Sequence, residues 1–160
     1  MDRTKTMRLS AFLVEAKRRT YAGLDDDATV STPIIVGSKQ LEYADRDLSY
    51  RDIYFGMAYF AGQEVVMADQ RTIWSMSYAG GISSAITDRE KIRAIYAFLR
   101  KALLRVDEER PFRGPSHFEE GSHRYTDSSE GDISEFHGVE QVYLEGARVY
   151  RLDYCGGIIR

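Results

Sequence analysis

Two glutamates, Glu64 and Glu140, are the residues of this sequence with the clearest potential for chemistry. Each lies in a strand-like segment whose alternation places it on the apolar face. A carboxylate on such a face must be paired, hydrogen-bonded or protonated, because burying it alone is costly and raises its pKa. Two such carboxylates close together would offer the acid and the base of a hydrolase or a lyase. The competing interpretation is that an arginine neutralises each glutamate, the candidates being Arg51, Arg71, Arg113 and Arg148.

Aromatic residues lie on strand faces near both glutamates. Aromatic rings beside a carboxylate suit an organic cation, although rings on a strand face also serve simply as core. The run Arg113-Gly114-Pro115 is typical of a rigid turn, in which Arg113 either binds an anion or pairs with one of the glutamates. The predicted ligand-binding residues, none of them catalytic, are Glu64, Glu140, Trp74, Tyr78, Tyr150, Tyr154 and Arg113.

The remaining reactive residue types give weaker signals. His117, His123 and His137 match no standard metal-ligand spacing, so we expect no metal site and no cofactor. The single cysteine, Cys155, excludes an intramolecular disulfide, and nothing around it marks a reactive thiol. We therefore expect it to be buried and inert. The basic run Lys17-Arg18-Arg19 is interpreted as a solvated helix face.

An internal repeat relates the segments that carry the two glutamates. When residues 60–82 are laid without gaps over residues 136–158, identical residues coincide at eight positions. With gaps, Asp52-Ile53 also matches Asp132-Ile133, and Gly37-Ser38 matches Gly121-Ser122. The ungapped identities are Phe60 with Phe136, Gly62 with Gly138, Glu64 with Glu140, Val66 with Val142, Tyr78 with Tyr154, Gly80 with Gly156, Gly81 with Gly157, and Ile82 with Ile158.

The elements that must position these residues are helices followed by hairpins. Apolar residues at helical spacing predict a helix over 7–21, and the capping box at 87–90 predicts a second helix that ends before Pro111. Segments rich in β-branched and aromatic residues follow each helix, with Asp69-Gln70 and Glu145-Gly146 as hairpin tips. We expect an α+β fold in one domain over 1–160, made of copies at about 7–82 and 87–159. Each copy is a helix plus antiparallel strands, and the two main helices pack on an antiparallel sheet with pseudo-twofold symmetry.

Composition excludes several classes of protein. A net charge of −3 argues against nucleic-acid binding, which normally needs a basic patch. No apolar run is long enough for a membrane span, and the first residues lack a signal peptide, so we expect a cytoplasmic protein. The sequence leaves open whether the protein forms a homodimer.

Several runs resemble a prokaryotic family, the domain of unknown function 5680 family. They are Tyr50-Arg51-Asp52-Ile53-Tyr54-Phe55-Gly56, Phe60-Ala61-Gly62-Gln63-Glu64-Val65-Val66, Ile73-Trp74-Ser75-Met76, Arg113-Gly114-Pro115 and Gly156-Gly157-Ile158-Ile159. Members of that family occur alone or behind a helix-turn-helix module, which implies a regulatory, effector-sensing role. In outline the repeated unit is also similar to gyrase-inhibitor-like effector domains, in which a glutamate among aromatics meets cationic ligands.

The leading functional hypothesis is a non-catalytic domain that binds a small organic or cationic ligand in a cleft between the two copies. One alternative is a hydrolase or lyase that uses the Glu64 and Glu140 pair. The other is a protein-interaction module.

Overall fold

The computed structural model describes residues 3–23 and 32–160, which form two helices and eight strands. We call α1 with β1–β4 the first half and α2 with β5–β8 the second half. The first half contains α1 (Arg3–Arg19), β1 (Lys39–Asp45), β2 (Leu48–Gly56), β3 (Tyr59–Ala68) and β4 (Arg71–Ile82). The second half contains α2 (Arg89–Leu103), β5 (His117–Glu120), β6 (His123–Asp132), β7 (Glu135–Leu144) and β8 (Ala147–Ile158).

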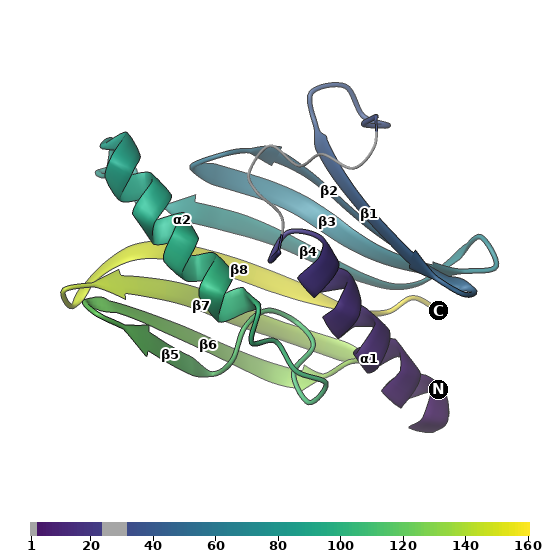
Figure 1. Cartoon of the computed structure of the whole chain (residues 1–160). Coiled ribbons are helices and arrows are strands. Elements are labelled where there is room, and N and C mark those ends of the chain that lie inside the picture. Colours follow the sequence, from purple (N-terminus) through teal and green to yellow (C-terminus); the bar gives the residue numbers. More distant parts are fainter. Residues whose placement is uncertain (1–2, 24–31) are drawn as a thin grey trace.

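All eight strands belong to one antiparallel sheet, in the order β1-β2-β3-β4-β8-β7-β6-β5. Each half is a meander of four strands, and the halves join through β4 and β8, where Tyr78 lies opposite Tyr154. Both helices lie on the same face of this sheet (Figure 1). We call this the covered face and the opposite one the uncovered face.

The expected fold class was wrong in its proportions. Two main helices were expected to pack on a sheet, but the molecule is mostly one eight-stranded sheet with two short helices. An amphipathic stripe is a strong signal over a long window, whereas a short strand gives a weak one. Which strand edges meet is decided by tertiary packing, so the sequence did not show that β4 and β8 merge two meanders into one sheet.

Local signals in the sequence placed several element boundaries correctly. Asp88 caps α2 by accepting a hydrogen bond from the Lys91 backbone nitrogen at 2.7 Å, as the capping box predicted. The turn between β3 and β4 has positive φ at Asp69 (48°) and Gln70 (63°), and the turn between β7 and β8 has 52° at Glu145. Both predicted hairpin tips are therefore confirmed. The first helix begins at Arg3, before its predicted start at residue 7.

Side chains alternate between the two faces of the central strands. Trp74, Met76 and Tyr78 of β4 are buried on the covered face, whereas Ser77 between the last two is exposed. Strand β8 repeats this pattern, which confirms the predicted packed face. The core between the sheet and the helices includes Leu13 of α1 and Ile95 of α2, both fully buried. In the described residues, neither helix has the length and apolar character to cross a membrane.

Candidate functional site

Each half carries a pair of buried carboxylates on the covered face. Glu64 of β3 lies opposite Asp52 of β2, and Glu140 of β7 lies opposite Asp127 of β6. We call Asp52 with Glu64 the first carboxylate pair, and Asp127 with Glu140 the second carboxylate pair. Both glutamates are fully buried, and both aspartates are nearly so. The sheet therefore holds four acidic groups in its core.

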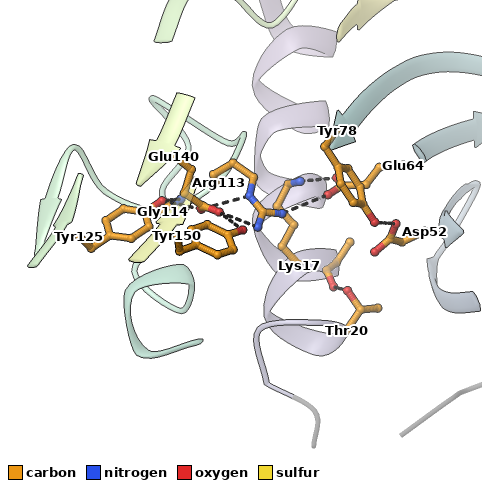
Figure 2. Close-up of polar contacts among 11 residues, drawn as sticks. Lys17, Thr20, Asp52, Glu64, Tyr78, Arg113, Gly114, Tyr125, Glu140 and Tyr150 are labelled. Atoms are coloured by element: carbon orange, nitrogen blue, oxygen red, sulfur yellow. Dashed lines mark hydrogen bonds and ion pairs between the residues drawn. The ribbon is translucent and has the colours of Figure 1, made fainter. Parts of the chain in front are cut away.

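The glutamate of the second carboxylate pair is saturated with hydrogen-bond donors. Arg113 donates from Nε to Oε2 at 3.2 Å and from Nη2 to Oε1 at 3.0 Å. The hydroxyls of Tyr125 and Tyr150 donate to Oε2 and Oε1 at 2.7 and 2.8 Å (Figure 2). Tyr125 also accepts from the backbone nitrogen of Gly114 at 2.9 Å, which fixes the turn that presents Arg113. Such a charge-assisted network fixes the orientation of the Glu140 carboxylate.

The glutamate of the first carboxylate pair has fewer partners. Lys17 of α1 donates from Nζ to Glu64 Oε2, and both side chains are fully buried. Within the part of the chain that the structure describes, Glu64 Oε1 has no hydrogen-bond partner, and Nη1 of Arg113 lies 4.0 Å from it. Figure 2 shows Arg113 between the two glutamates, bonded to Glu140 and beside Glu64. The two equivalent glutamates are thus unequally satisfied.

A tyrosine holds each aspartate. Tyr78 donates to Asp52 Oδ1 at 2.6 Å, and Tyr154 donates to Asp127 Oδ1 at 2.8 Å. Arg110 adds a bond from Nη2 to Asp127 Oδ2 at 3.0 Å. Burial, reinforced by the negative glutamate opposite, raises the pKa of Asp52 to about 7 and that of Asp127 to about 7. Both aspartates therefore exchange protons near neutral pH.

Aromatic rings surround the two buried cations. Lys17 Nζ lies 5.5 Å from the ring centre of Tyr21 and 5.7 Å from that of Trp74. The guanidinium of Arg113 lies 5.0 Å from Tyr21 and 5.9 Å from Tyr78. Burial lowers the pKa of Lys17, against the opposing effect of Glu64. Burial acts on Arg113 in the same sense, but Glu140, Tyr21 and Tyr150 together outweigh it and raise the Arg113 pKa.

Within the described residues, six buried side-chain polar atoms have no hydrogen-bond partner, and four of them lie on Glu64 and its neighbours. Arg110 Nη1 and His123 Nε2 belong to the second half, and the other four are Glu64 Oε1, the hydroxyls of Tyr21 and Tyr50, and Nε1 of Trp74. Tyr50 of β2 and Trp74 of β4 lie diagonally across from Glu64, and the Tyr21 ring lies beside Lys17, which bonds Glu64. Burial first, and then the charge of Glu64, raises the pKa of both tyrosines. We call these four residues the Glu64 cluster. Each such atom costs about 1–3 kcal/mol when left unsatisfied, so the cluster has unused hydrogen-bonding capacity.

The structure brings most of the predicted site residues into one network. Glu64, Glu140, Arg113 and Tyr150 join directly, Tyr78 contacts Arg113, and Trp74 joins through Lys17. Tyr154 instead bonds Asp127. The predicted arginine partner is Arg113, which hydrogen-bonds Glu140 and forms a longer ion pair with Glu64, whereas the cation hydrogen-bonded to Glu64 is Lys17. Arg51 pairs elsewhere, with Glu42 at 2.7 Å.

Sequence reasoning missed the lysine that bonds Glu64 and the aspartate that lies opposite Glu140. The expectation that Lys17 is solvated was wrong. Its side chain lies between α1 and the sheet, where it bonds Glu64 and is fully buried. The match of Asp52 to Asp132 was also wrong, since Asp127 is the aspartate opposite the second glutamate. The spacing Tyr50-x-Asp52 recurs as Tyr125-x-Asp127, one residue out of step with the offset that relates the two glutamates. This recurrence could have identified Asp127. The match of Gly37-Ser38 to Gly121-Ser122 was likewise wrong. Gly121 and Ser122 form the turn between β5 and β6, whereas Gly37 and Ser38 precede β1.

The histidines and the cysteine lie away from this network. His117 lies 3.3 Å from Glu119, and His137 lies 3.7 Å from Glu130. Within residues 3–23 and 32–160, no group of histidine, cysteine or acidic side chains is arranged to hold a metal ion. Cys155 is exposed, which corrects the expectation of a buried thiol. Its neighbour Tyr154 faces the core, so the alternation of β8 directs Cys155 to the uncovered face.

A family model described as Domain of unknown function (DUF5680) matches residues 52–159. The chain belongs to this family. The match begins at Asp52, so it includes both carboxylate pairs and Arg113 but not Lys17 or the rest of α1. No curated protein and no solved structure matches the chain significantly.

Proposed function

We propose that this domain binds a small polar organic molecule at the Glu64 cluster and does not catalyse a reaction. One observation carries the proposal: Glu64 Oε1 is fully buried without a hydrogen-bond partner, whereas both oxygens of Glu140 are bonded. A ligand with an amine or hydroxyl donor would satisfy this oxygen. An acceptor on the same molecule would satisfy the Trp74 nitrogen. The surrounding aromatic rings favour a ligand that is cationic or partly apolar.

The position of Arg113 supports a site between the two halves. Arg113 belongs to the second half, and it reaches both Glu140 and the vicinity of Glu64. A ligand bound at Glu64 therefore contacts elements of both halves. This arrangement supports the regulatory, effector-sensing role that we propose for the domain. We propose the cytoplasm as its location, because a chain with one cysteine carries no intramolecular disulfide.

We also propose that the two halves are copies of one unit. They share the same order of one helix and four strands. Tyr78 and Tyr154 lie opposite each other at the centre of the sheet, and each bonds the aspartate of its own half. Duplication explains why both halves carry a carboxylate pair, and divergence explains why only one glutamate is saturated.

The network argues against the glutamate pair as a catalytic acid and base. General acid catalysis needs one carboxyl that carries a proton. Each glutamate is instead paired with a buried cation, and Arg113 occupies the space between them. We therefore do not favour a hydrolase or lyase.

A protein-interaction role is the second candidate function. The β2–β3 hairpin exposes Phe55, Met57 and Tyr59, of which Met57 is 71% and Tyr59 67% exposed. Exposed apolar side chains close together are typical of contact surfaces between proteins. This role predicts that alteration of the hairpin, and not of the Glu64 cluster, disrupts function.

A thermal-shift screen of Tyr50→Phe tests the ligand site. The Tyr50 hydroxyl has no partner, so its removal leaves the fold intact but deletes one ligand contact. We expect one class among organic cations, amines and polyols to stabilise the wild type by about 2.7 kcal/mol at 100 times its dissociation constant. Tyr50→Phe should reduce this shift. Tyr143→Phe, which removes a hydroxyl bonded to Gln141 outside the cluster, should keep it.

Two results would count against the ligand site. One is the absence of a shift with every class of compound, which would favour the protein-interaction role. The other is an equal shift in the wild type and in Tyr50→Phe, which would place the ligand elsewhere.

A further inference from the structure

Three titratable side chains from adjacent strands form a row on the uncovered face. Cys155 of β8 lies opposite His137 of β7, and His137 lies opposite Glu130 of β6. Directly opposed residues of antiparallel strands have Cβ atoms about 4.5–5.5 Å apart, so the imidazole can reach the thiol. Nε2 of His137 lies 3.7 Å from Glu130 Oε2. The order of thiol, imidazole and carboxylate is that of a nucleophile, its base and the group that orients the base.

An open depression lies beside the thiol. It has a volume of about 570 Å³, which falls in the range of small-molecule sites. It borders Cys155 directly and extends between β3, β4 and β8. Its lining offers groups of both charges together with neutral hydrogen-bonding groups, as a small zwitterionic molecule requires; these are Gln63, Ser75, Ser77, Ser134, Glu135 and Arg160.

We propose that Cys155 is a modification site, where His137 promotes disulfide exchange with a small zwitterionic disulfide held in this depression. His137 removes the proton from the Cys155 thiol. The resulting thiolate attacks one sulfur of the small disulfide, so that a bond forms between Cys155 and that sulfur while the original bond between the two sulfurs breaks. The departing thiolate keeps the electron pair and takes up the proton from His137. This site lies on the face opposite the Glu64 cluster and does not depend on the proposed function.

The other charged groups that face Cys155 make His137 the decisive one. Glu135 and Arg160 line the depression with opposite charges. Asp153, two residues away on β8, is paired with Arg151 at 2.7 Å. Among these neighbours, Glu135 opposes a negative charge on sulfur and Arg160 favours it, whereas His137, directly opposite, is the group that can also accept the thiol proton.

The test measures how fast oxidised glutathione forms a mixed disulfide, by mass spectrometry of the intact protein. The chain has one cysteine, so the added mass reports Cys155 alone. We compare the wild type with His137→Gln across a range of pH. His117→Gln removes another exposed histidine that has a glutamate neighbour, and it serves as the matched control. Urea-unfolded wild type gives the rate of the same thiol without its neighbours, and Cys155→Ser gives the background.

We expect the folded wild type to react about threefold faster at neutral pH than the unfolded chain. A neighbouring base that accepts the thiol proton raises the share of thiolate available for attack, and this gain exceeds the loss in nucleophilicity. His137→Gln should return the rate to that of the unfolded chain and move the midpoint of the pH profile upward, and His117→Gln should do neither. A folded wild type no faster than the unfolded chain overturns the proposal without any variant. Equal pH midpoints for the wild type and His137→Gln overturn the role of the histidine.

Discussion

Glu64 and Glu140 occupy equivalent places in the two halves, each fully buried and each opposite an aspartate. Their surroundings nevertheless differ. Glu140 accepts hydrogen bonds from Arg113 and two tyrosines, whereas one oxygen of Glu64 has none. The comparison teaches that one strand geometry supports either a closed polar network or a network with unused capacity. The difference lies in the cation, since an arginine can bond both carboxylate oxygens and a lysine acts as a point charge.

The largest expected effect is the loss of Arg113. Arg113→Met leaves Glu140 without its cation and removes the second cation near Glu64, so we expect a loss of about 3–5 kcal/mol in the free energy of unfolding. Lys17→Met should cost less, because Arg113 can still serve Glu64. Urea unfolding measures both. A larger loss in Lys17→Met would mean that the first carboxylate pair, and not the second, dominates the stability of the core.

The aspartates predict that stability falls as pH rises toward neutral. The pKa of Asp52 and that of Asp127 are raised from an ordinary value near 4 to about 7 in the fold, first by burial and then by the glutamate opposite. Between these values the folded chain binds more protons than the unfolded chain. Each aspartate thus removes on the order of 1 kcal/mol of stability per pH unit as pH rises through this window.

Urea unfolding between about pH 4 and pH 8 measures this slope, and two variants separate its sources. Asp52→Asn and Asp127→Asn should each reduce the slope of the free energy of unfolding against pH by the contribution of one aspartate. The matched control is Asp45→Asn, which makes the same change at an exposed aspartate at the end of β1. It should leave the slope as it is in the wild type. A curve of unchanged slope in both core variants would show that the aspartates stay ionised.

Two equivalent tyrosines offer a smaller and sharper contrast. Tyr125→Phe removes a donor to Glu140 and the acceptor for the Gly114 backbone nitrogen, so we expect it to cost about 1–3 kcal/mol. Tyr50→Phe removes a hydroxyl that has no partner, so the change in stability should be near zero or favourable. Thermal unfolding of both variants provides the comparison. Equal losses would indicate that the Tyr50 hydroxyl is satisfied in solution.

The two hairpin tips give the smallest expected difference. The β7–β8 turn places Gly146 at φ 83°, whereas the β3–β4 turn places Gln70 at φ 63°. Glycine accepts this left-handed conformation at little steric cost, so Gln70→Gly should stabilise the fold by up to about 1 kcal/mol. Gly146→Gln should destabilise it by a similar amount. Thermal unfolding measures both variants, and a loss of stability in Gln70→Gly would mean that contacts of the Gln70 side chain outweigh backbone strain.

The sequence allowed prediction of local features and of the faces of strands. Alternation placed Glu64 and Glu140 correctly on the packed face, and the turn residues at 69–70 and 145–146 placed two hairpins. It did not predict Lys17, because its long stem reaches under α1 to a carboxylate that only the folded sheet brings near. It missed Asp127 because the equivalent strands differ by one residue, and such a shift is visible only in the register.

The pairing of β4 with β8 also has a consequence for the rate of folding. It joins Tyr78 to Tyr154, which are far apart along the chain, whereas each hairpin joins neighbouring segments. Contacts of high sequence separation form late, because the entropy of closing a long loop must be overcome before they are made. We infer that the hairpins, with the carboxylate pair that each half carries, form first and that the pairing of β4 with β8 forms last. A nascent chain therefore brings Arg113 of the second half beside Glu64 only when β8 is complete.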